Sequence, residues 1–200
     1  MSDRYRTLSG TAQAFLREKA SRFIAIAFPI DDQDDFKQRL DAIAREHHSS
    51  RHVCYAWVLG DAGDHQRAND AGEPAGTAGR PILNRILGLQ LTYTAVVVVR
   101  YFGGTLLGKS GLIKAYGDAA QLALNEAPIT ERQIRGTIAI VCTHAQFETL
   151  KRELKALQGE VLKSEFSSMV NAIVAVPKSK VQEMAARLQT RGITVHAADR

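Results

Sequence analysis

The stretch AVVVVRYFGGTLLGKSGLIKAYGDAA, residues 95–120, decides the fold. It opens with an alanine and four consecutive valines, and an apolar run with no polar interruption predicts a fully buried strand ending at Arg100. Glycines recur over the next residues, and an apolar repeat at helical spacing begins at Leu112. The stretch therefore predicts a buried strand, a glycine-rich turn and a helix.

The junction between this strand and helix has the composition of an anion site. Backbone amides and the positive end of the helix dipole converge at a helix start, with Ser110 as the expected N-cap. We expect neither a dinucleotide-binding fold nor a nucleotide P-loop here. The alternative is that the glycines only form the turn that packs the helix on its strand. The residues expected to bind an anion or nucleic acid are Arg100, Gly103, Gly104, Lys109, Ser110 and Lys114.

Composition limits the class of protein. The 200 residues suit one large domain or two small ones, and the net charge of +5 favours acidic partners such as nucleic acid. Cys54 and Cys142 lie in apolar runs without metal-ligand spacing, so we expect reduced thiols and a cytoplasmic protein. No apolar run is long enough for a signal core or a membrane span, so we expect a soluble protein without a membrane partner.

The first half of the chain predicts an α+β layer with the helices on one face of the sheet. In the strand Val53–Leu59, alternation places Tyr55 and Trp57 on one face. There the two aromatic side chains either pack in the core or stack on a base. The expected elements are a hairpin of strands 12–16 and 22–28, a helix from 31 to about 47, strand 53–59, a long loop 60–80, a short helix 82–87 and the central strand.

Titratable side chains before and within the long loop are the candidates for catalysis. His52, Asp70 and Glu73 could supply a proton donor and acceptor beside the anion site. The alternative is structural: His52 caps a strand, and the two acids hold the loop backbone. The acids between Asp31 and Asp35 complement a helix dipole, so we expect no metal and no cofactor.

The second half restarts near Pro128 and predicts the order βαββαβ, which is that of a ferredoxin-like module. We therefore expect two domains, 1–128 and 129–200. The second contains 11 lysines and arginines against 7 aspartates and glutamates. Basic residues on an open sheet suit RNA or a ribosomal surface, and such a sheet also serves as a platform for a protein partner.

Three motifs in this order, RHVCYAW, DAGEPAGTAGRPIL and AVVVVRYFGGTLLGKSGLIKAYGDA, closely resemble the YigZ/IMPACT family. The resemblance covers essentially the whole chain. It implies an N-terminal domain like the second domain of ribosomal protein S5 and a ferredoxin-like C-terminal domain, shapes that also occur in the translocation GTPase where it contacts ribosomal RNA. The family's recurrent positions correspond here to Arg22, His52, Asp70, Gly72, Glu73, Gly76, Thr77, Gly79, Arg100, Gly103, Gly104, Gly108, Gly111 and Tyr116.

Two residues depart from the family's pattern. Ala71 stands where relatives commonly carry a second aspartate, which weakens a metal or acid-pair site, and Ser110 stands where they commonly carry glycine. The resemblance implies a setting in translation, but not kinase regulation, which belongs largely to an additional domain of the eukaryotic members.

Three functions follow from these observations. The first is binding of structured RNA or ribosomes, linked to regulation of translation, with Tyr101 or Trp57 available to stack on a base. The second is a small enzyme that acts on a phosphorylated or carboxylated ligand at the glycine loop. The third is a docking adaptor that binds a protein through the C-terminal sheet.

Overall fold

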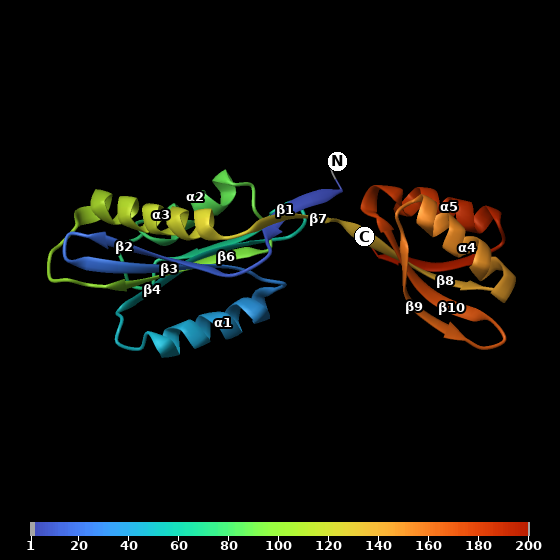
Figure 1. Cartoon of the computed structure of the whole chain (residues 1–200), viewed down its shortest axis with the longest axis horizontal. Helices are drawn as coiled ribbons and strands as arrows, with labels where there is room; N and C mark the ends of the chain where they lie inside the picture. Colours follow the sequence, from blue (N-terminus) through green and yellow to red (C-terminus); the bar gives the residue numbers. More distant parts are fainter. Residues whose placement is uncertain (1–2, 200) are drawn as a thin grey trace. The chain divides into compact units, whose positions relative to one another are not determined.

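The computed structural model describes residues 3–199, which form two compact units. Residues 5–132 make up the first unit, and residues 133–199 together with residues 3 and 4 make up the second. Each unit has its own hydrophobic core, and Figure 1 shows helices packed on sheets in both. The predicted α+β class is confirmed. None of the helices within residues 3–199 has the length and apolar character needed to cross a bilayer.

The first unit is built on a five-stranded sheet of order β2-β3-β6-β4-β5, in which all neighbouring strands are antiparallel. The central strand β6 contains the predicted run, and Ala95 to Val99 are all completely buried. The strands are β2 (Ala12–Glu18), β3 (Ser21–Pro29), β4 (His52–Leu59), β5 (His65–Asn69) and β6 (Thr94–Tyr101).

Helices cover both faces of this sheet, so the expectation of helices on one face is wrong (Figure 1). The helices α2 (Gly79–Gly88) and α3 (Gly108–Glu126) pack against Val96 and Val98 of β6. The helix α1 (Gln33–Glu46) packs against Val97 and Val99 on the opposite face. A strand that is apolar on both faces needs a cover on each, which explains the additional layer.

Three strands of the first half escape prediction because their sequences are short and largely polar. The strand β5 lies inside the region predicted as a loop and pairs with β4 at the sheet edge, where its side chains meet solvent. The strands β1 (Arg4–Leu8) and β7 (Ile129–Gln133) form a separate two-stranded sheet. Pairing between such distant segments leaves no local signal in a sequence.

The second unit has the predicted element order βαββαβ and a four-stranded sheet of order β11-β8-β10-β9. Residues of both helices share one core with the inward residues of the sheet. The elements are β8 (Arg135–Cys142), α4 (His144–Ala156), β9 (Glu160–Phe166), β10 (Val170–Pro177), the 3-10 turn η1 (Lys178–Lys180), α5 (Val181–Thr190) and β11 (Thr194–Asp199). Cys54 and Cys142 are buried free thiols in their respective units.

Candidate functional site

One end of the five-stranded sheet gathers the segments that sequence analysis singled out; we call it the loop end. It comprises the β2–β3 turn, the start of β4, residues 70–79, and the glycine loop 102–107 between β6 and α3. Cross-strand register places His52 opposite Arg100 and Arg22 opposite Tyr101. Figure 1 shows the β2–β3 turn and the loop after β6 at the same end of the sheet.

A buried ion pair lies at the centre of the loop end. Arg100 Nη1 donates to Glu73 Oε1 at 2.6 Å, and their side chains are 6% and 4% exposed. Tyr116 Oη donates to the same oxygen at 2.8 Å, and Arg100 Nη2 donates to Ser21 Oγ at 3.3 Å. The guanidinium also lies over the Phe23 and Phe102 rings, at 5.6 and 5.3 Å from their centroids.

This pair corrects the role expected for Arg100. Its charge is neutralised by Glu73 and its side chain is only 6% exposed, with the guanidinium near the Phe23 and Phe102 rings, so it does not present its charge to an external phosphate. A buried charge is retained only with a partner and further hydrogen bonds, and Glu73 and Ser21 provide them. Arg100 therefore connects segments of the fold.

The three catalytic candidates meet at the loop end, but both carboxylates are already engaged. His52 Nδ1 lies 2.9 Å from the Ala71 carbonyl oxygen, which can only accept, so Nδ1 carries the proton in this contact. His52 Nε2 then faces Glu73 Oε1 at 4.0 Å, beyond hydrogen-bond distance. Asp70 turns its carboxylate to the backbone of its own loop, while its carbonyl accepts from Cys54 Sγ at 3.0 Å.

The Asp70 carboxylate organises residues 70–79. It accepts from the amides of Gly76, Ala78 and Gly79 at 2.8–2.9 Å. Burial raises the pKa of Asp70, but these amide hydrogen bonds outweigh it and hold the pKa below its ordinary value. For Asp70 the arrangement matches the alternative in which the acids hold the loop backbone, whereas Glu73 bonds the side chains of Arg100 and Tyr116.

The glycine loop combines one tightly packed glycine with two that adopt left-handed backbone. A Cβ at Gly103 would lie 1.9 Å from the carbonyl oxygen of Ala20, so no larger residue fits there. Gly104 and Gly108 have φ of 88° and 71° and open surroundings. Beyond Gly103 the loop is open to solvent, and Leu106 is 81% exposed.

Helix α3 begins earlier than predicted, which changes the role of Ser110. The N-cap position is Leu107, with no side-chain hydrogen bond, so Ser110 lies inside the first turn and is not the cap. The first amides of this long helix thus face solvent beside the exposed Lys109. Lys114 is also exposed but forms an ion pair with Asp118, Nζ to Oδ2 2.6 Å.

The segment GGTLLGKS, residues 103–110, has the GxxxxGK[ST] spacing of a phosphate-binding P-loop, a pattern that the expectation of no nucleotide P-loop did not take into account. Its strand–loop–helix context agrees with that pattern, because Lys109 and Ser110 lie in the first turn of α3. Its surroundings differ, since β6 belongs to an antiparallel sheet and Gly103 is wedged against Ala20. The segment has the features of a phosphate site without the parallel sheet of the nucleotide-binding fold.

Two further cations, Lys19 and Arg22, lie at the loop end, Lys19 beside the glycine loop and Arg22 on the opposite, α1 face of the sheet. Lys19 Nζ donates to the carbonyl of Leu106 at 3.4 Å, which places the lysine against the glycine loop. The Arg22 guanidinium lies 4.6 Å from the centroid of the Tyr101 ring. Both residues belong to a hairpin that was predicted, and only its pairing with β6 brings them to the loop end.

The two aromatic residues predicted to stack on a base, Trp57 and Tyr101, differ in how deeply they are buried. Trp57 is 4% exposed and packs in the core beneath α1, so it is not accessible to a base. Tyr101 is half-buried, and its hydroxyl lies 3.0 Å from His47 Nδ1. Within residues 3–199, no group of three or more histidine, cysteine or acidic side chains is arranged to hold a metal ion.

Comparison with known proteins relates both halves of the chain to described families. Residues 19–124 match the Impact N-terminal domain, and residues 140–192 match a domain of unknown function, DUF1949. The chain is 36% identical over 172 residues to the IMPACT family member YigZ of Escherichia coli, covering 85% of this chain and 84% of that protein. It is 35% identical over 138 residues to the IMPACT family member YvyE of Bacillus subtilis, covering 69% of this chain and 64% of the relative.

A solved structure, described as "Crystal structure of an hypothetical protein", shares the fold along almost the whole chain. It superposes with a TM-score of 0.75 at 32% identity, covering 98% of both chains.

Proposed function

The chain belongs to the IMPACT family, and on that premise we propose that it binds structured RNA or ribosomes through the loop end and takes part in the regulation of translation. The observation that carries the proposal is the position of Lys19 against the exposed glycine loop and of Lys109 in the first turn of α3, with Arg22 at the same end of the sheet on its α1 face. Two acids of the loop end leave these charges uncompensated, because Glu73 is paired with Arg100 and Asp70 is bonded to backbone amides.

The loop end offers two kinds of donor to a phosphate backbone. The three cations contribute charge attraction that is independent of base sequence. The amides at the start of α3, from Gly108 to Gly111, add directional hydrogen bonds and the positive end of the helix dipole. Gly104 and Gly108 keep the backbone bare where a phosphate would approach. Ser110 adds a hydroxyl in the same turn, and Lys114 lies on the following turn.

The architecture of the two units supports the same role in translation. We assign residues 1–128 to a fold like the second domain of ribosomal protein S5, and residues 129–200 to a ferredoxin-like fold. The element order and the strand order β11-β8-β10-β9 favour the second label. Buried free thiols accord with a cytoplasmic location.

Capture of ribosomal particles and RNA by the immobilised protein tests the proposal. The variant carries Lys19→Ala, Arg22→Ala and Lys109→Ala. The control variant loses the same charge at exposed residues elsewhere: Lys37→Ala, Arg45→Ala and Lys155→Ala. Capture by the wild type and the control, strong at about 50 mM salt and weak at about 200 mM, with loss in the loop-end variant, is the expected result.

Two outcomes would overturn the proposal. If the loop-end variant captured as much RNA as the wild type, the loop end would not be the binding surface. Absence of RNA capture, combined with saturable binding of ATP or pyrophosphate that needs Lys109, would assign the GxxxxGKS segment to a small phosphorylated ligand. His52, with its Nε2 close to Glu73, would then be the residue to test for proton transfer.

A further inference from the structure

The strand β9 forms an open edge of the four-stranded sheet. It stands last in the strand order, and within residues 3–199 no strand pairs with its outer side. Large apolar side chains are exposed along the hairpin of β9 and β10, with Phe166 beside α4 and Ile173 on the open face of the sheet: Leu162 (54%), Phe166 (61%), Met169 (38%) and Ile173 (39%). An unpaired edge with exposed apolar residues is a template for another strand.

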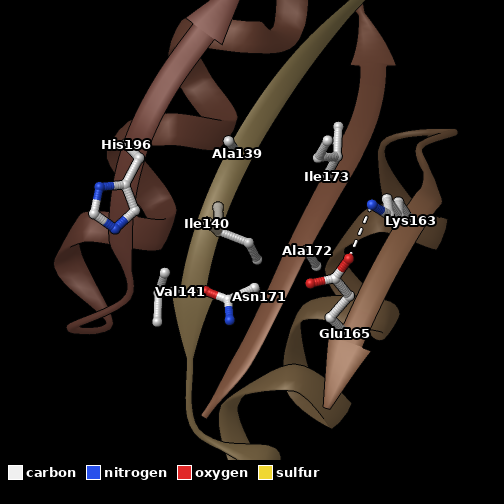
Figure 2. Close-up of a pocket in the computed structure, with 9 residues that line it drawn as sticks. All are labelled: Ala139, Ile140, Val141, Lys163, Glu165, Asn171, Ala172, Ile173 and His196. Carbon is white, nitrogen blue, oxygen red and sulfur yellow. Dashed lines mark ion pairs between the residues drawn. The ribbon is translucent and has the colours of Figure 1, made fainter. Parts of the chain in front are cut away.

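On this edge a positive and a negative residue, Lys163 and Glu165, flank Ser164. Lys163 and Glu165 lie opposite Ile173 and Asn171 of β10, on the open face of the sheet. Their side chains are about two-thirds exposed, at 67% and 66%, and Lys163 Nζ lies 2.9 Å from Glu165 Oε1. Figure 2 shows the two side chains beside each other on β9, next to a hollow of about 220 Å³ lined by Val141, Asn171 and His196, among others.

We propose that β9 pairs with β9 of a second copy of this chain, antiparallel and centred on Ser164. This register places Lys163 opposite Glu165 of the second copy and Glu165 opposite its Lys163. Opposite charges directly across a ladder stabilise strand pairing, and the same surface serves both copies, as a two-fold axis requires.

The charges select this register over its neighbours. Centring the pair on Lys163 opposes two lysines, and centring it on Glu165 opposes two glutamates. A parallel, in-register pair opposes like residues throughout. Like charges directly opposite each other destabilise a ladder, so the antiparallel register around Ser164 is the favoured pairing.

A bulge limits the length of the pairing. The register of β9 against β10 shifts at Leu162, which lies between Lys163 opposite Ile173 and Val161 opposite Val174 and has no partner of its own; this leaves the segment from Lys163 to Phe166 for regular pairing with another copy. A short ladder predicts a weak, reversible dimer whose population rises with protein concentration.

Two single charge reversals and their mixture test the proposal on the full, nuclease-treated chain by sedimentation equilibrium. In a dimer of the Lys163→Glu variant, glutamates face each other at both charged positions. In a dimer of the Glu165→Lys variant, lysines face each other at both. Each variant alone is expected to dimerise at least about tenfold more weakly than the wild type. Mixed together they restore both opposite-charge pairs, so the expected product is a heterodimer of wild-type affinity.

The mixture separates pairing between copies from the ion pair within one copy, because neither variant regains its own Lys163–Glu165 pair on mixing. The matched control reverses Lys151, which forms a similar exposed pair with Glu148 on α4, and leaves dimerisation unchanged. A wild type that stays monomeric at all concentrations would overturn the proposal, as would a mixture that behaves like its separate components. Either result leaves the RNA proposal intact, since the loop end uses other residues.

Discussion

Arg100 and Glu73, 27 positions apart in the chain, form an ion pair that is almost completely buried in the first unit. A single carboxylate oxygen, Glu73 Oε1, accepts from both Arg100 and Tyr116. It thereby joins the 70–79 loop to the end of β6 and to α3. The glycine loop leaves β6 two residues after Arg100, so this pair holds the start of the proposed RNA-binding surface.

Replacement of Glu73 by glutamine tests the ion pair as a structural element. Glu73→Gln leaves the Arg100 cation buried without a counter-charge, and loss of one partner of a buried pair costs about 3–5 kcal/mol. Urea denaturation followed by circular dichroism measures the decrease in the free energy of unfolding. The control is Asp118→Asn, which breaks the exposed contacts to Lys114 and Arg85 and is expected to cost less than about 1 kcal/mol. Equal losses would contradict the account.

Gly103 tests how closely the glycine loop packs on the β2–β3 turn. In Gly103→Ala the new methyl group meets the carbonyl oxygen of Ala20, and the backbone must shift. Overpacking of this kind lowers the free energy of unfolding by about 1–3 kcal/mol. Gly88→Ala at the end of α2 is the control, because no atom lies within 4 Å of its added Cβ. A thermal unfolding midpoint for Gly103→Ala as high as that of the control would show that the loop is not held there.

Asp70 gives a prediction for the dependence of stability on pH. Its folded-state pKa lies below the ordinary 3.8, so the ionised form stabilises the fold above the unfolded-state pKa. This contribution disappears as the pH falls through the folded-state pKa. As the pH falls below about 4, the free energy of unfolding of the wild type is therefore expected to decrease more steeply than that of Asp70→Asn, which cannot ionise. Parallel profiles of unfolding free energy against pH would contradict the assigned hydrogen bonds.

Trp57 reports whether RNA reaches the core aromatics. It is the single tryptophan of the chain and is buried beneath α1. Binding of RNA at the loop end is expected to leave its fluorescence emission and its low accessibility to acrylamide unchanged. Strong quenching by RNA would indicate that a base stacks on Trp57, as one sequence-based interpretation allowed.

Much of the fold follows from local patterns in the sequence. The uninterrupted apolar run of Ala95–Val99 is typical of a central strand, and it forms one. The acidic cluster predicted a helix with an acidic first turn, and Asp34 and Asp35 lie in the first turn of α1; Asp32 also caps this helix by accepting from their amides. Alternation also placed Tyr55 and Trp57 correctly on one face of β4.

The role of Arg100 could not be predicted because its partner is distant in sequence. A cation at the end of a buried strand, before a glycine loop, has the same local pattern whether it binds a ligand or a buried carboxylate. Only the fold of residues 70–79 brings Glu73 to it. Lys19 was not predicted as a site residue for the same reason, and Arg22 was predicted only as a recurrent family position, since pairing between β3 and β6 places them at the loop end.

The salt dependence of RNA affinity tests the central claim most directly. The association constant of a structured RNA is measured over a range of salt concentrations for the wild type, the Lys19, Arg22 and Lys109 triple variant, and the Lys37, Arg45 and Lys155 control. Each lost phosphate contact reduces the slope of log affinity against log salt by about 0.7–0.9, so the loop-end variant, which loses three cations, is expected to have a slope shallower by about 2 to 3 and the control an unchanged slope. A loop-end variant with the wild-type slope and affinity would contradict the account.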